Sequence, residues 1–124
     1  MNDKIIKATD VRHNPKHIQA QKEGKCPMEY LVYSALIEEA QVLKHGADKY
    51  GVRNWRRDKI LASTYEGAML RHFLAWAMGQ DIDPDSGKSP LTHLRACCAV
   101  VLDAVEHGTL IDDRGRCESK SQGE

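Results

Sequence analysis

Two adjacent carboxylates, Glu38 and Glu39, stand in a segment that has the apolar spacing of a helix. Glu39 lies beside one apolar stripe of this helix and Glu38 lies in line with a second stripe, so both carboxylates sit at the margin of the surface that the helix buries. Metal-binding carboxylates of helical bundles occupy such positions. Acidic residues on a solvated helix flank are also common, and position alone leaves the two interpretations equally open.

A second group of oxygen atoms lies in the segment 80–90, QDIDPDSGKSP, whose Asp, Pro, Ser and Gly content is typical of a turn. Asp83 and Asp85 could contribute oxygens to a divalent cation, or they could cap the turn and the next helix. A calcium-binding loop is not matched, because its later glutamate is missing. His93 follows in the first helical turn and could approach whatever this segment binds. His72 stands in an apolar stripe, where a histidine is more often a hydrogen-bonded core residue than a ligand.

Two further places have residue types that contact nucleotides. Trp55 precedes Arg56 and Arg57, so a ring that can stack on a base adjoins cations that can neutralise phosphate. The alternative is a Trp that closes the end of a helical bundle. The Gly24-Lys25 pair could form a phosphate-contacting loop, although a plain surface turn explains it as well and the full P-loop pattern is absent.

Three segments have the apolar period of amphipathic helices and would position these side chains. Each is followed by a glycine that serves as a stop signal. We expect one helix from Pro27 or Met28 to Tyr50, a second that begins after an N-cap at Ser63 or Thr64 and ends at Met78, and a third from Pro90 or Leu91 to His107. Their stops are Gly51, Gly79 and Gly108. The third segment is apolar nearly all round, so we expect it to be the most buried helix.

These elements predict an all-α fold, a compact bundle of three to four helices. We expect dimerisation to complete the bundle, because a chain of 124 residues with polar ends builds only a thin core. The expected organisation is a polar N-terminal arm over 1–23 with little fixed structure, at most a short turn of helix, then a helical domain over 24–108 and a disordered C-terminal tail over 109–124.

Composition excludes several classes of function. The 18 basic and 18 acidic residues give a formal net charge of zero, which does not favour general nucleic-acid binding. No apolar run reaches the length of a membrane span, and the N-terminus lacks the apolar core of a signal peptide. The four cysteines form no CxxC pair, so we expect reduced thiols and a cytoplasmic protein.

Taken together, the motifs resemble a phage and bacterial family, the dATP/dGTP diphosphohydrolase N-terminal domain family. The resemblance covers roughly residues 24–107. Each piece is short, and their combination in this order is specific. The residues that carry it are Gly24-Lys25, Leu31, Ala35-Leu36, Glu38-Glu39-Ala40, Val42-Leu43, Gly46-Ala47, Lys49-Tyr50-Gly51, Asn54-Trp55-Arg56, Arg71-His72, Gly79, Asp83, Asp85-Ser86-Gly87 and His93.

The resemblance implies a relation to the all-α MazG-like enzymes, which are usually dimeric and hydrolyse the α–β bond of a nucleoside triphosphate with Mg²⁺ held by helix carboxylates. It therefore implies a Mg²⁺- or Mn²⁺-dependent hydrolase that converts dATP or dGTP to the monophosphate and pyrophosphate. The implied site has three parts. The metal ligands are Glu38, Glu39, Asp83 and Asp85; the catalytic residues are Glu39, His72 and His93; the substrate-binding residues are Lys25, Lys49, Tyr50, Asn54, Trp55, Arg56 and Arg71.

Two other functions stay open. The helix that carries Glu38 lacks the ExxE pattern of MazG-like enzymes, so the chain could be a nucleotide-binding or phage accessory module without catalysis. A phosphohydrolase of the HD type needs a His-Asp doublet, and the sequence has none.

Overall fold

The computed structural model describes residues 6–7 and 12–115. They belong to two compact units that divide between Leu31 and Val32, later than the boundary expected after Glu23.

The N-terminal unit contains the helix α1 (Pro15–Lys22) and the single 3₁₀ turn η3 (Met28–Tyr30). The Asn14 side chain caps α1 by accepting the Lys16 N–H at 2.9 Å, and Pro15 occupies the first helical position. This part of the chain was expected to have little fixed structure; the structure places a short helix in it.

The helix α2 (Tyr33–Tyr50) opens the second unit, and it begins later than the start predicted at Pro27 or Met28. The prediction was wrong at this end because Leu31 and Val32 are extended, with ψ of 144° and 102°. Helical hydrogen bonding cannot continue through such residues, so η3 and α2 remain separate.

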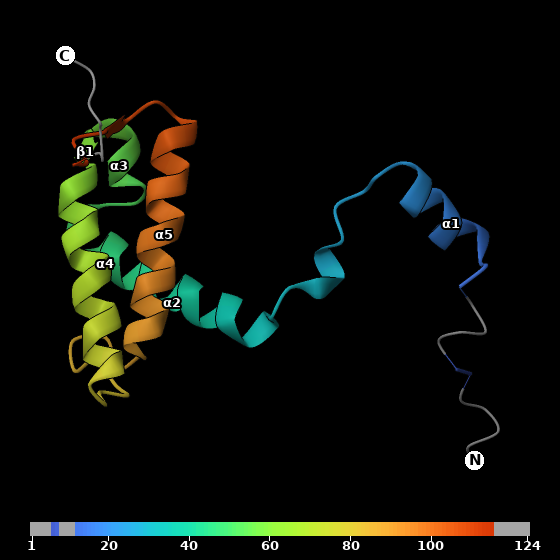
Figure 1. The fold of residues 1–124 in the computed structure, drawn as a ribbon, viewed down its shortest axis with the longest axis horizontal. Coiled ribbons are helices and arrows are strands. Elements are labelled where there is room, and N and C mark those ends of the chain that lie inside the picture. Colours follow the sequence, from blue (N-terminus) through green and yellow to red (C-terminus); the bar gives the residue numbers. More distant parts are fainter. Residues whose placement is uncertain (1–5, 8–11, 116–124) are drawn as a thin grey trace. The chain divides into compact units, whose positions relative to one another are not determined.

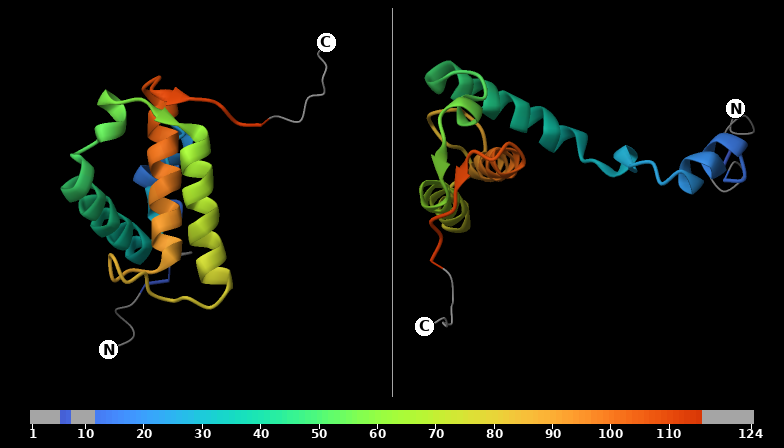
Figure 2. Two further views of the ribbon diagram at one scale, coloured as in Figure 1. Left: turned by 90° about the vertical axis from the view of Figure 1, so that its left-hand side faces the viewer. Right: turned by 90° about the horizontal axis from the view of Figure 1, so that it is seen from above.

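The second unit continues with the short helix α3 (Asn54–Arg57) and the long helices α4 (Ala62–Ala77) and α5 (Pro90–Glu106). Helices α4 and α5 lie side by side and share the largest helix–helix contact, while α2 packs against α5 (Figures 1 and 2). The fold is mostly helical, as predicted. The glycines that follow α2, α4 and α5 all have positive φ, which confirms them as stops: Gly51 at 95°, Gly79 at 104° and Gly108 at 68°.

The core of this unit follows one line of α5. Thr92, Ala96, Val100 and Ala104 are buried and recur every four residues, so they share one side of the helix. Most of these side chains are small, which allows neighbouring helices to come close. Helices α2 and α4 each bury one residue, so α5 is the most buried helix, as predicted.

A pair of short strands, which the sequence did not suggest, ties the end of the described chain back to the start of α4. Strand β1 (Ile60–Leu61) pairs in parallel with β2 (Leu110–Ile111), in the register Ile60 to Leu110. The frayed tail predicted from Thr109 is therefore wrong for residues 109–115. Residues 116–124 lie outside the described part.

The cap of α4 also comes from a distant residue. Its N-cap position is Leu61, which makes no side-chain bond, rather than the predicted Ser63 or Thr64. The Asp113 carboxylate instead accepts the Ser63 backbone N–H at 2.8 Å and the Ser63 hydroxyl at 2.5 Å. A carboxylate at a helix N-terminus satisfies free N–H groups and favours the helix dipole. Within residues 6–7 and 12–115, no helix has the length and apolar content that a membrane span requires.

We predict that Asp113→Ala lowers the melting temperature by about 2–5 °C, because the first turn of α4 loses its acceptor. Ser63→Ala removes the hydroxyl donor alone and should have a smaller effect. The double variant should destabilise less than the sum of the two, as expected for residues in contact. Asp58→Asn, an exposed carboxylate between α3 and β1, serves as the control for loss of charge. Additive effects in thermal unfolding would contradict the contact.

Candidate functional site

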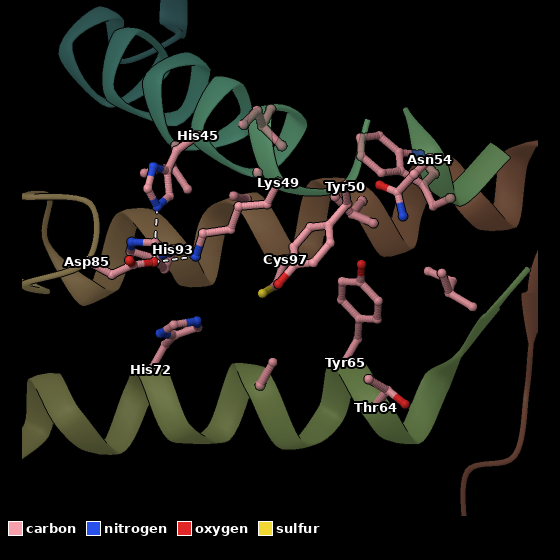
Figure 3. Close-up of a pocket in the computed structure, with 18 of the residues that line it drawn as sticks. His45, Lys49, Tyr50, Asn54, Thr64, Tyr65, His72, Asp85, His93 and Cys97 are labelled. Carbon is pink, nitrogen blue, oxygen red and sulfur yellow. Dashed lines mark hydrogen bonds and ion pairs between the residues drawn. The ribbon is translucent and has the colours of Figure 1, made fainter. Parts of the chain in front are cut away.

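A cavity of about 660 Å³ lies between α2, α4 and α5, and Asp83 and Asp85 of the loop 80–89 border it at one end. Its two ends differ in chemistry (Figure 3). One end is lined by His45, His72, His93 and Asp85, and the other by the tyrosines Tyr50 and Tyr65 together with Asn54 and Thr64. We call them the imidazole end and the tyrosine end. The side chains reach the cavity from α2, α3, α4, α5 and the loop, all within one unit.

At the imidazole end, His72 of α4 and His93 of α5 stack with ring centroids 4.9 Å apart and an interplanar angle of 24°. Asp83 from the loop joins them, and one ligand atom from each of the three residues lies within 4.8 Å of the others. The hydroxyl Oγ of Ser86 is 2.5 Å from His93 Nε2. The two histidines and Asp83 are the cluster of candidate metal ligands that the described residues contain.

The loop conformation explains why Asp83 and His93 meet. The Asp85 backbone N–H donates to Asp83 Oδ1 at 2.8 Å, and the Gly87 N–H donates to the Asp83 carbonyl at 2.8 Å, with Gly87 at a φ of 76°. This is the turn chemistry that the sequence of the loop indicates. Ser89 then caps α5, which places His93 in the first turn of the helix beside the loop.

Both stacked imidazoles are partly buried, and burial lowers the pKa of His72 and of His93. Withdrawal from water disfavours the charged form, and for His72 the neighbouring His93 lowers the pKa further. The two rings are therefore neutral at pH 7, the form in which an imidazole can accept a proton or bind a metal.

Asp85 carries the charge pairing at this end of the cavity. Its Oδ2 contacts the Lys49 ammonium and lies 3.0 Å from His45 Nε2, both on α2 (Figure 3). The hydrogen bonds from Lys49 and His45 lower the pKa of Asp85 to about 2. The same contact with Asp85 raises the pKa of Lys49. An ammonium ion thus faces the cavity at neutral pH.

At the tyrosine end, burial raises the pKa of Tyr65. Trp55 lines the cavity there, but its indole N–H donates to Asp103 of α5 at 2.7 Å. Arg56 makes a two-point contact with the same carboxylate, at 2.7 and 2.9 Å. The interpretation of Trp55 as a residue that closes the bundle is supported by these contacts, because Asp103 anchors α3 to α5.

The structure brings eight of the predicted site residues to this cavity. They are Lys49, Tyr50, Asn54, Trp55, His72, Asp83, Asp85 and His93. Four others lie outside its lining. Glu38 accepts the Thr92 hydroxyl at 3.4 Å, Glu39 pairs with Arg95 at 3.0 Å, Arg56 is held by Asp103, and Arg71 is exposed on α4. Lys25 belongs to the N-terminal unit, where it pairs with Glu23 at 3.1 Å.

The predicted site residues omit three contributors: His45 and Tyr65, which line the cavity, and Asp103, which anchors α3. The signal for His45 was present, since it precedes Lys49 by one helical turn and therefore lies on the same side of α2. Tyr65 was counted among the apolar residues of its helix. No local pattern identifies Asp103, because its partners are 47 and 48 residues away in the chain.

The chain belongs to the family described as dATP/dGTP diphosphohydrolase, N-terminal, whose model matches residues 15–114. This confirms the family that the motifs predicted. The match spans both the N-terminal helix and the whole cavity. No curated protein and no solved structure matches the chain significantly.

We predict that Asp103→Asn lowers the melting temperature by on the order of 5 °C, because Trp55 and Arg56 lose a charged acceptor. The matched control is Glu106→Gln, which removes an exposed carboxylate one turn later and should leave the melting temperature within about a degree.

The stability that Asp103 contributes should decrease as the pH becomes acidic. Arg56 and Trp55 hold the pKa of Asp103 well below its ordinary value, so its contribution is present above the unfolded pKa of about 4 and disappears as the pH falls through the folded value. Thermal unfolding at a series of pH values should show wild type and Asp103→Asn converging below about pH 4. A gap that stayed constant into acid would argue against the ion pair.

Proposed function

We propose that the chain binds a purine deoxynucleoside triphosphate in the cavity and hydrolyses it to the monophosphate and pyrophosphate. The observation that carries this proposal is the two-ended cavity in a member of the dATP/dGTP diphosphohydrolase family. Its volume of about 660 Å³ lies in the range of roughly 300–1,000 Å³ that small-molecule sites occupy. We expect this activity in the cytoplasm, where deoxynucleoside triphosphates are made and used.

The triphosphate suits the imidazole end. Lys49 presents a compact positive charge there, and in the free protein this charge is paired with Asp85. Phosphate oxygens compete well with a carboxylate for an ammonium ion, because they carry more charge. The arriving phosphate would therefore exchange with Asp85, which keeps His45 as a partner.

The base and sugar suit the tyrosine end. Tyr50 and Tyr65 offer faces on which a purine can stack, and Asn54 offers an amide that both donates and accepts hydrogen bonds. Trp55 adds apolar surface while its N–H is occupied by Asp103.

The proposed reaction places a water oxygen on the α-phosphorus. The bond from this phosphorus to the α–β bridging oxygen breaks, and pyrophosphate leaves with the bonding electron pair. The proton of the attacking water passes to an imidazole, for which the cavity offers His45, His72 and His93. Glu39 is less suited to this role than these histidines, since Arg95 holds it outside the cavity lining.

The Mg²⁺ implied by the family resemblance fits these residues poorly. Mg²⁺ prefers carboxylates, phosphates and water in octahedral geometry. Glu38 and Glu39 have Thr92 and Arg95 as partners, and Asp85 is held by Lys49 and His45. The carboxylate that remains beside the stacked rings is Asp83, and its neighbours are imidazole nitrogens.

We predict that the purified chain releases pyrophosphate and the monophosphate from dATP or dGTP, measured across a panel of nucleotides and divalent metals. Lys49→Ala should raise KM about tenfold or more, because a phosphate contact is lost. Lys44→Ala is the matched control, an exposed lysine of α2 that pairs with Asp48 and should leave the kinetics unchanged. If the wild type binds nucleotide without hydrolysing it, the chain is a nucleotide-binding module and the proposed hydrolase activity is wrong.

We also propose that the chain forms a homodimer through the outer side of α4. Leu70, Phe73, Leu74 and Ala77 follow the i, i+3, i+4, i+7 spacing of one apolar stripe, and Leu70 and Leu74 are about half exposed, at 53% and 52%. The inner side of α4 lines the cavity and contacts α5. An exposed apolar stripe on the outer side of a helix marks a surface that a partner covers. A second copy of the chain would supply the same stripe.

Leu74→Glu is therefore expected to convert a dimer into a monomer in sedimentation equilibrium, because a charge would be desolvated in the interface. The control is Leu102→Glu on α5, which is 71% exposed and should remain dimeric. A monomeric wild type, or a dimer that survives Leu74→Glu, would rule out this surface.

A further inference from the structure

We propose that His72, Asp83 and His93 together bind one divalent transition-metal ion at the imidazole end of the cavity. The three side chains come from α4, the loop 80–89 and α5, and each contributes a ligand atom within 4.8 Å of the other two. They are separated by at least ten residues in the chain, so the cluster results from tertiary packing rather than from a local sequence motif.

The positions of the carboxylate oxygens favour an ion. Asp83 Oδ1 is already occupied, because it accepts the Asp85 backbone N–H at 2.8 Å. Its other oxygen, Oδ2, faces His93 Nε2 at 3.9 Å, too far for a direct hydrogen bond. A cation between these two atoms would bind both, and the hydrogen bond to Oδ1 would hold the carboxylate in place, as groups around metal ligands commonly do.

The spacing is close to what one ion requires. Imidazole nitrogens and carboxylate oxygens bind such ions at about 2.0–2.2 Å, so two ligand atoms on opposite sides of one ion are at most about 4.4 Å apart. The observed limit of 4.8 Å exceeds this by an amount that small side-chain rotations can close. The Ser86 hydroxyl at 2.5 Å from His93 Nε2 would then turn to the ion or to water beside it.

The ligand types decide the class of metal. Two imidazoles with one carboxylate suit Mn²⁺, Fe²⁺, Co²⁺ and Zn²⁺, whereas Mg²⁺ and Ca²⁺ select oxygen ligands. Three protein ligands also leave coordination positions open, as in catalytic rather than structural sites. All three residues line the cavity, so the open positions face the space that Lys49 also borders.

This inference rests on the geometry of three side chains and stands without the proposed hydrolysis, although an ion at this place would serve it. It also limits which residues can accept the proton of the attacking water. An imidazole nitrogen bound to a metal cannot accept the proton of the attacking water. His45, whose Nε2 lies 3.0 Å from Asp85 Oδ2, is then the imidazole that remains for that role at this end of the cavity.

The test is Co²⁺ binding to the full chain without nucleotide, followed by the visible absorption of Co²⁺ and by isothermal titration calorimetry. We expect one ion per chain and no displacement by a tenfold excess of Mg²⁺. His72→Gln, Asp83→Asn and His93→Gln should each weaken binding by more than the roughly 10–100-fold that loss of a supporting residue costs. Ser86→Ala should fall between these variants and wild type.

Controls separate this site from other metal-binding groups. His17→Ala removes one member of the exposed pair His13 and His17 and should leave Co²⁺ affinity unchanged. Circular dichroism of the metal-free variants shows whether each is folded, and three independent substitutions keep the test valid if one is not. The proposal is overturned if folded variants of the three residues bind as wild type does, if a thiolate-to-cobalt absorption band shows that cysteines are the ligands, or if Mg²⁺ displaces Co²⁺. A protein that binds Co²⁺ through these residues but hydrolyses no nucleotide would retain the metal site and lose the proposed function.

Discussion

Close packing along one side of α5 is the constraint on which the rest of the second unit depends. Thr92, Ala96, Val100 and Ala104 recur at the helical period, and most are too small to hold neighbouring helices far apart. The adjacent line of the same helix contains His93 and Cys97, and both face the cavity. Ala96 and Val100 of the packed line border the cavity as well, so the line that brings the helices together also forms part of the wall of the space between them.

The two aspartates of the loop, Asp83 and Asp85, have different electrostatic surroundings. Asp85 faces α2, where Lys49 and His45 keep it ionised. Asp83 faces α4 and α5, where its neighbours are the imidazoles of His72 and His93. Burial lowers the pKa of both rings. A spacing of two residues in a tight turn directs the carboxylates to different partners. One end of the cavity thus combines a charged pair with a group of metal-ligand type.

Local patterns in the sequence predicted what depends on local physics. The apolar period and the glycine stops located α4, α5 and the end of α2. Residue types and spacing pointed to Asp83 and His93, and the family resemblance added Lys49 and His72. The start of α2 was wrong because extended residues interrupt an apolar pattern that continues through them. The cap from Asp113 and the anchor at Asp103 join residues about 50 positions apart, and spacing along the chain contains no signal for such contacts. Glu38 shows the same limit of sequence reasoning. It lies on the same side of α2 as His45 and Lys49, yet it contacts Thr92 rather than the cavity. The point where α2 crosses α5 decides which residues on that side border the cavity.

The geometry of the loop also bears on whether the cluster of His72, Asp83 and His93 is formed before a ligand arrives. Asp83 is oriented by a backbone N–H of Asp85, and its own backbone is held by Lys88 and Gly87. None of these bonds uses the Asp85 side chain. If a phosphate took Lys49 from Asp85, the carboxylate of Asp85 would lose a partner while its backbone still held Asp83 in place. The Lys49 ammonium can therefore exchange partners without disturbing the residues beside it. A site that admits a charged substrate next to a fixed set of ligands would require this property.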